Sequence, residues 1–220
     1  MEFLQIKNYV EKIKTDIIGY RREFHKYPEL GFEEYKTSAR IQKLLAEWDI
    51  EVSPNIAKTG VVGLLKGAKP GKTVALRADM DALPIKEESD VEYKSRIDGK
   101  MHACGHDGHT AMLLGAARTL ANFRNQIEGN IKLIFQPAEE GPSPGGAYLM
   151  TKEGVLDDVD AIFGMHLNPL LPTGKVLVNK KRAMAAADIF EITLIGKGGH
   201  AGLPHQSVDA IAMAGKVIEA

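Results

Sequence analysis

Residues 102–110, HACGHDGHT, gather three histidines, the single cysteine of the sequence and an aspartate. Thiolate and imidazole groups are the ligands that zinc and similar divalent cations prefer, so Cys104 and His106 are candidate metal ligands. Taken alone, a cysteine is more often a small buried hydrophobe than a ligand. The segment therefore needs support from elsewhere in the chain before it indicates a metal site.

Three further groups of titratable side chains follow stretches that read as strands. They are Asp79 and Asp81 in VALRADMD, Glu139 and Glu140 in FQPAEEG, and His166 in IFGMH. Taken one at a time, they have ordinary explanations as capping aspartates, a solvated carboxylate pair and a loop histidine. In an open α/β sheet, however, the carboxyl ends of strands form the edge where ligands collect. Their joint placement at that edge favours a metal site.

The donor types indicate catalytic rather than structural metal chemistry. A closed structural zinc site is usually rich in sulfur, and this sequence has one cysteine, so an open catalytic site is favoured. Of two adjacent glutamates, one can bind a cation while the other stays free. A free carboxylate beside activated water is the usual general base of metal-assisted hydrolysis. The residues do not choose among zinc, manganese, cobalt and nickel.

The elements that must position these residues alternate along the chain. Apolar periodicity predicts helices over residues 3–17, 33–48, 105–123 and 145–154, and short apolar runs predict strands over 60–67, 72–81, 130–137 and 160–166. The last strand is apolar almost throughout, as expected for a strand that is covered on both faces. Alternating strands and helices predict an α/β fold with helices on both sides of the sheet.

The character of the sequence changes near residue 182. Residues 185–200 alternate like a strand with one solvated face, and residues 207–220 begin a helix. We therefore expect the N-terminal part of a catalytic domain over 1–181 and the start of a second domain over 182–220. The glycine-rich GKGGHAGLPH in this region lacks the Lys-Ser/Thr ending of a phosphate-binding loop.

Composition excludes several partners. The 220 residues include 28 Lys and Arg against 29 Asp and Glu, for a net charge of -1, so no basic surface for nucleic acid or an anionic membrane is expected. A single cysteine cannot form an intrachain disulfide. The sequence has neither a signal-peptide pattern nor an apolar run of membrane-spanning length, so we expect a cytoplasmic protein.

The ordered motifs resemble a known enzyme family. They are RREFHKYPELGFEE, RADMDALP, HACGHDGHT, FQPAEEG, GMH and GKGGHAGLPH, and they resemble the amidohydrolase branch of the dinuclear metallo-aminoacylase and carboxypeptidase superfamily. That branch includes hippurate hydrolases, indole-acetyl-amino-acid hydrolases and N-acetyldiaminopimelate deacetylases. The resemblance implies a zinc-peptidase-like open mixed sheet with an inserted α+β lid and dimerisation domain, and a homodimer. It also implies that a metal-bridging hydroxide cleaves the amide bond of an N-acyl amino acid or short peptide, with two divalent cations (Mn, Zn, Ni or Co) per subunit.

Roles carry over to matching positions. The metal ligands that the resemblance implies are Cys104, His106, Glu140 and His166, with Cys104 bridging two metals. Glu139 resembles the general base, and His200 resembles the lid histidine that holds the substrate from a partner subunit. Asp79 resembles an aspartate that follows a ligand histidine by two positions in the wider superfamily, where this sequence has Arg77. We expect His102 and His109 to support the ligands or cap the helix, and no role follows for His25.

Length leaves alternatives open. Members of the branch are nearly twice as long and take a fifth ligand, a histidine, from the C-terminal part of the catalytic domain. The last histidine here is His205, so the sequence resembles the N-terminal part of such an enzyme. The alternative is a truncated, catalytically impaired fragment that binds metal without turnover. A third reading, a structural zinc module, predicts that a chelator unfolds the domain.

Overall fold

The computed structural model describes residues 2–178 and 189–219. The chain divides into two compact units, which we call unit 1 (Met1–Leu170) and unit 2 (Leu171–Ala220). The predicted domain boundary between residues 181 and 182 lies outside the described residues and stays a prediction.

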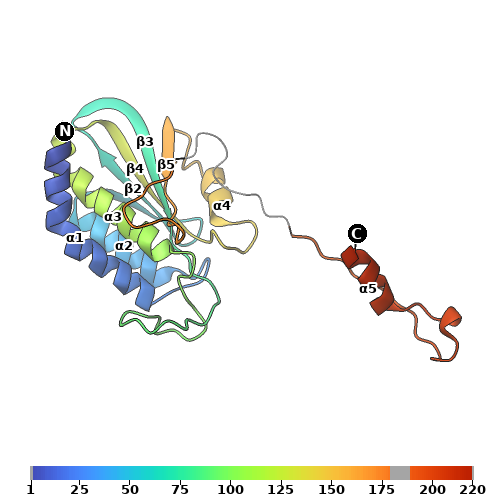
Figure 1. The fold of residues 1–220 in the computed structure, drawn as a ribbon. Coiled ribbons are helices and arrows are strands. Elements are labelled where there is room, and N and C mark those ends of the chain that lie inside the picture. Colours follow the sequence, from blue (N-terminus) through green and yellow to red (C-terminus); the bar gives the residue numbers. More distant parts are fainter. Residues whose placement is uncertain (1, 179–188, 220) are drawn as a thin grey trace. The chain divides into compact units, whose positions relative to one another are not determined.

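A five-stranded mixed sheet forms the centre of unit 1 (Figure 1), in the order β1-β2-β4-β3-β5. The strands are β1 (Glu51–Ile56), β2 (Gly60–Lys66), β3 (Lys69–Asp79), β4 (Glu128–Gln136) and β5 (Ala161–Gly164). β2 is antiparallel to β1 and β4, whereas β3 is parallel to both β4 and β5. The three parallel strands therefore place their carboxyl ends at one edge of the sheet, and this confirms the predicted open mixed sheet.

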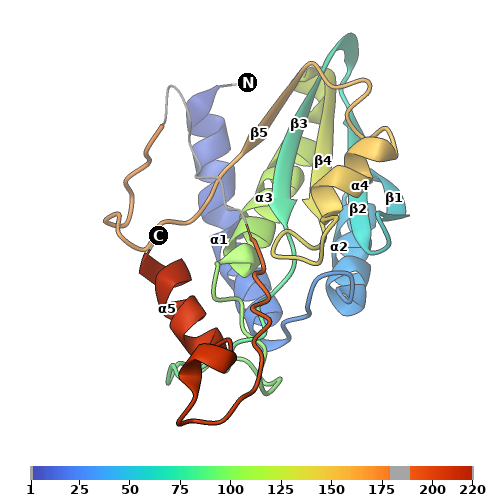
Figure 2. The ribbon, with the colours of Figure 1, turned by 90° about the vertical axis from the view of Figure 1, so that its right-hand side faces the viewer.

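Helices cover both faces of this sheet (Figure 2). They are α1 (Phe3–Lys26), α2 (Tyr35–Glu47), α3 (His106–Asn122) and α4 (Gly146–Lys152). Successive side chains of a strand point to opposite faces of a sheet, so neighbouring residues of β4 contribute to the cores on its two faces. Phe135 belongs to the main core with α1, α2 and α3, whereas its neighbour Ile134 packs in a second cluster with Met150 of α4. The predicted arrangement of helices on both faces is confirmed.

Strand β5 corrects one expectation. The apolar segment 160–166 was expected to be covered on both faces, but its strand residues 161–164 are all exposed, with Phe163 at 61 %. In the described part of the chain, β5 stands at the edge of the sheet and pairs with β3 alone. An apolar run reports the hydrophobicity of a strand, not its place in the sheet, and therefore cannot distinguish a central strand from an edge strand.

The remaining differences lie at the ends of elements and in one strand. α1 continues to Lys26, beyond the predicted stretch, and of its apolar residues near the N-terminus Phe3 is 80 % exposed whereas Ile13 is buried. The edge strand β1 was not among the predicted strands. Its sequence EVSPNI is mostly exposed and contains Pro54, which sheets tolerate mainly at edges.

Unit 2 contains α5 (Ala210–Glu219), as predicted, and a short 3-10 helix over Pro204–Gln206. The strand predicted over 185–200 begins in residues that lie outside the described ranges. Its described part, 189–200, forms no strand and makes only an isolated bridge from Lys197 to Val208. A strand needs a partner along its length, which the described residues do not supply. Among the described helices of both units, none has the length and apolar character to cross a membrane.

Candidate metal centre

Three of the predicted ligands converge at the carboxyl edge of the sheet. One donor atom each from Cys104, His106 and His166 lie within 4.8 Å of one another, and Cys104 Sγ is 3.4 Å from His166 Nε2. Gly105 has φ 87°, a left-handed conformation that favours glycine. The chain turns there from the loop carrying Cys104 into α3, whose first residue is His106, and this turn directs both side chains to one place.

Both imidazoles offer the same nitrogen. Nδ1 of His106 lies 3.2 Å from the Asp81 carboxylate, and Nδ1 of His166 donates to the Leu167 carbonyl at 2.7 Å. A neutral imidazole that donates through Nδ1 keeps a free lone pair on Nε2. Among the described residues, the buried Nε2 of His106 has no hydrogen-bond partner. The unpartnered buried nitrogen of His106 lies near a thiol and a second imidazole nitrogen, and this set of donors fits a cation.

The two predicted glutamates join the same group. His106 Nε2 lies 3.8 Å from a carboxylate oxygen of Glu139 and 3.8 Å from one of Glu140, and these three residues form a second potential ligand set. The Asp81 carboxylate, which contacts Nδ1 of His106, also accepts the Glu140 backbone N–H at 2.9 Å. Asp81 therefore holds both of these residues in place. We call Cys104, His106, Glu139, Glu140 and His166 the candidate metal centre.

The electrostatics of this centre show a surplus of negative charge. Burial, together with the nearby Glu140 carboxylate, raises the pKa of the Cys104 thiol to about 12. Burial and the Glu140 charge also raise the pKa of Glu139. Burial alone would lower the pKa of His106, but its hydrogen bond to Asp81 and nearby carboxylates outweigh burial and raise it. A bound divalent cation would offset this charge and favour the thiolate.

Hydrogen bonds from Asp79 through His109 to the backbone of Leu167 support the neighbouring ligand His166. Asp79 accepts from Arg77 at 2.7 Å and from Nδ1 of His109 at 2.6 Å, and Nε2 of His109 accepts the Leu167 N–H at 2.9 Å. Burial would raise the pKa of Asp79, but the hydrogen bond from His109 and nearby cationic groups outweigh it and lower the pKa to about 2. Both nitrogens of His109 are thus occupied, and the residue following His166 is held in place.

The sequence pattern singled out Asp79 and Asp81 together, but it did not predict that Asp81 holds His106 and Glu140. Asp79 lies 3.7 Å from Nε2 of His106, whereas Asp81 contacts its Nδ1 directly.

His109 supports the site, as expected, and the spacing of three residues from His106 on α3 is a signal that places both on one side of a helix. His102 is buried, which lowers its pKa to about 4, and neither His102 nor His109 caps α3 through its side chain.

His200 belongs to unit 2, outside this group of residues. Its side chain is exposed, and its Nδ1 accepts the Gly202 N–H at 3.0 Å. Its role toward a substrate stays a prediction.

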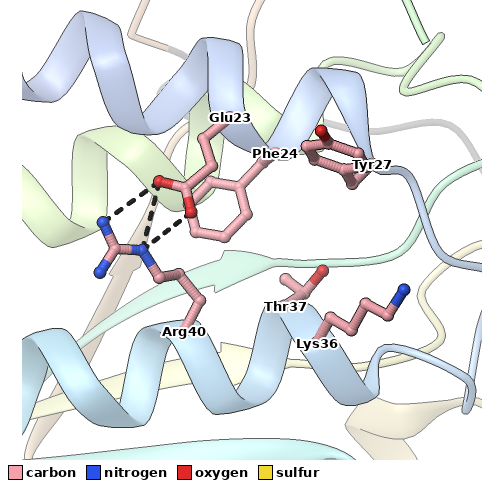
Figure 3. A pocket seen from close by; sticks show the side chains of 6 residues that line it. All are labelled: Glu23, Phe24, Tyr27, Lys36, Thr37 and Arg40. Carbon is pink, nitrogen blue, oxygen red and sulfur yellow. Dashed lines mark hydrogen bonds and ion pairs between the residues drawn. The ribbon is translucent and has the colours of Figure 1, made fainter. Parts of the chain in front are cut away.

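A pocket of about 270 Å³ between α1 and α2 lacks comparable chemistry (Figure 3). Most of its polar lining is already paired: Arg40 makes hydrogen bonds to both oxygens of Glu23, Thr37 donates to Glu29, and the Tyr27 hydroxyl accepts from Arg96. We interpret it as a gap in helix packing rather than a reactive site.

Comparison with known proteins identifies the family of the chain. Residues 75–219 match peptidase family M20/M25/M40. The chain is 48% identical over 214 residues to an N-acyl-L-amino acid amidohydrolase of Geobacillus stearothermophilus, covering 97% of this chain and 58% of the relative. It is 49% identical over 208 residues to thermostable carboxypeptidase 1 of Saccharolobus solfataricus, covering 94% of this chain and 53% of the relative. The chain thus spans about half the length of the curated relatives it matches.

A solved structure gives the same result. A protein of Bacillus subtilis described as a dinuclear metal binding peptidase is 45% identical with a TM-score of 0.71, over 74% of this chain and 46% of that chain. A protein with a similar fold is therefore described as binding two metal ions.

Proposed function

Because this chain belongs to peptidase family M20/M25/M40, we propose that it forms the metal-binding part of an amidohydrolase that cleaves the amide bond of N-acyl amino acids or short peptides. The observation that carries the proposal is the convergence of Cys104, His106 and His166 donor atoms within 4.8 Å. The substrate class is supported by the names of the similar amidohydrolase and carboxypeptidase.

The donor set fits two divalent cations, in agreement with the dinuclear description of the similar Bacillus subtilis structure. We assign Cys104, His106 and His166 to one cation, and Cys104 with Glu140 to the other. A thiolate, imidazoles and a carboxylate suit zinc, manganese, nickel or cobalt. When bound, such cations polarise a carbonyl and lower the pKa of water.

Glu139 is the proposed general base. Its side chain is 40 % exposed and faces Nε2 of His106 across 3.8 Å, so it borders the ligands and remains accessible to water and substrate. Its pKa is raised, first by burial and then by the Glu140 charge. A carboxylate of raised basicity is suited to take a proton from water and to pass it to the leaving amine.

The remaining parts of the proposal concern the whole protein. We propose that His200 of a partner subunit holds the substrate carbonyl or carboxylate in a homodimer, in a cytoplasmic enzyme. The net charge of -1 favours neither nucleic acid nor an anionic membrane as a partner.

The test measures metal content and chelator-sensitive hydrolysis of N-acetyl amino acids by this chain. We expect Glu139→Gln to keep its metal and to lose at least about 100-fold in turnover, because general acid–base catalysis contributes that much. Glu11→Gln, at an exposed glutamate of α1, is the matched control and should change neither quantity.

Each other outcome has a defined meaning. Unchanged turnover in Glu139→Gln would refute the base assignment. Stoichiometric metal without turnover in the unsubstituted chain would favour the inert-fragment alternative. Loss of cooperative unfolding in chelator would favour a structural zinc module.

A further inference from the structure

The motif RREFHKYPELGFEE contains a buried histidine that the proposed chemistry does not use. We propose that His25 is a positioning residue: as a doubly donating imidazolium at the end of α1, it ties the first turn of α3 to the segment 84–100. Its consequence for metal binding rests on the proposed function, because that first turn begins with His106. The contacts of His25 with Asp107 and Glu87, from which the proposal is argued, all lie within unit 1.

The geometry requires a charged ring. His25 is 6% exposed, with Nδ1 2.9 Å from Asp107 Oδ2 and Nε2 3.2 Å from Glu87 Oε1. The side chains of Asp107 and Glu87 are 1% and 3% exposed. An ionised carboxylate only accepts hydrogen bonds, and a neutral imidazole has one N–H. Both contacts are hydrogen bonds at once only if both nitrogens of His25 carry a proton.

The surroundings balance this charge. From α1, Arg21 Nε lies 3.2 Å from the same Asp107 oxygen, so two cations face two buried carboxylates. From segment 84–100, the Tyr93 ring meets His25 edge-on at 5.6 Å. The His102 ring lies 6.5 Å away. The hydrogen bond to Asp107 raises the pKa of His25, burial opposes it, and Glu87 raises it further, so the net shift is upward from 6.5.

Glu87 organises the segment that leads toward Cys104. Its carboxylate accepts the Ser95 N–H at 2.6 Å and the Ser89 hydroxyl. Reciprocal backbone hydrogen bonds of 3.0 Å between Leu83 and Met101 close the segment into a loop. His25 thus joins this loop on one side to Asp107, the second residue of α3, on the other. Without the His25 ring, this contact would no longer hold the loop that leads toward Cys104 or the first turn of α3, which begins with His106.

The first measurement uses the unsubstituted, metal-free chain. In a nitrogen-15 NMR titration of the His25 ring, both nitrogens should be protonated at low pH and the ring should lose a proton with a midpoint above 6.5. A midpoint at or below 6.5 would overturn the proposal, and no variant has to fold for this result to count.

The second measurement tests positioning through amide hydrogen exchange. In His25→Gln, amides 108–111 in the first turns of α3 should exchange at least about tenfold faster, while amides 117–121 near its end keep their rates. His205→Gln, at an exposed histidine of unit 2, is the matched control. In the unsubstituted chain, the protection of 108–111 relative to 117–121 should fall as the pH rises above 6.5, and in His25→Gln this ratio should not depend on pH. Equal exchange in both chains would refute the positioning role.

The third measurement links the tie to the metal centre. Co²⁺ should bind His25→Gln about tenfold more weakly than His205→Gln, at the low end for residues that support ligands. Equal affinities would remove the link to metal binding. If the unsubstituted chain bound no Co²⁺, the proposed function would fail, whereas the ring protonation and exchange data would still decide the role of His25.

Discussion

The two imidazoles of the candidate metal centre are held in opposite ways. His106 is 1% exposed, opens α3 and has its Nδ1 against the buried Asp81 carboxylate. His166 is exposed, follows the edge strand β5 and donates only to the carbonyl of the next residue, Leu167. Both arrangements direct Nε2 toward the candidate metal centre, but only His106 has its Nδ1 held by a side chain from a distant part of the chain, the Asp81 carboxylate.

This difference separates the stability of the fold from the ability to bind metal. On the α3 side, the ligand is also part of the core, so its loss should affect folding and binding together. On the β5 side, the ligand is largely supported from the backbone of Leu167, whose N–H His109 accepts. Its loss should affect binding alone. Substitutions on the two sides therefore test the comparison directly.

The largest expected effect comes from removing each imidazole. His106→Ala and His166→Ala should both weaken Co²⁺ binding more than about 100-fold, beyond the 10–100-fold typical of residues that merely support ligands. Only His106→Ala should also destabilise the metal-free chain, by about 2 kcal/mol, because it leaves a buried carboxylate partly unsatisfied. Co²⁺ titration and urea unfolding in chelator measure the two quantities. Equal losses of stability in the two variants would contradict the asymmetry.

A smaller effect is expected from the anchor itself. Asp81 accepts from both the His106 ring and the Glu140 backbone, whereas asparagine has one acceptor oxygen and would turn an NH₂ group toward a donor. Asp81→Asn should weaken Co²⁺ binding about tenfold. Asp98→Asn, at an exposed aspartate, should bind Co²⁺ like the unsubstituted chain. An unaltered affinity in Asp81→Asn would mean that the anchor does not shape the ligand.

The smallest effect belongs to the β5 side. Phe163 is 61% exposed, so Phe163→Thr should change the free energy of unfolding by less than about 0.5 kcal/mol. The buried counterpart on β4 is Phe135, at 0% exposure, where Phe135→Ala should cost about 3 kcal/mol or more. Thermal or urea unfolding of both variants checks the contrast. A large loss in Phe163→Thr would show that β5 is part of the folded core after all.

Local pattern predicted much of unit 1 correctly. The strands β2, β3 and β4 and the helices α2, α3 and α4 follow from apolar periodicity, which the chain carries over short distances. The edge strand β1 and the exposure of β5 did not follow, because the position of a strand in a sheet depends on partners far away in sequence. The alternating run after residue 188 shows the same limit: without a neighbouring strand, the pattern produced no strand among its described residues.

By itself, the sequence determined which residue types lie at the carboxyl ends of strands and at the start of α3, because spacing and periodicity are local properties. Only the tertiary structure decided that Asp81 holds both His106 and Glu140, that the buried Nε2 of His106 is unpartnered among the described residues, and that His25 lies between Asp107 and Glu87. These contacts join residues 25 to 82 positions apart in the chain. Hydrogen bonds over such separations exist only once the core has brought the segments together, and no local pattern encodes them.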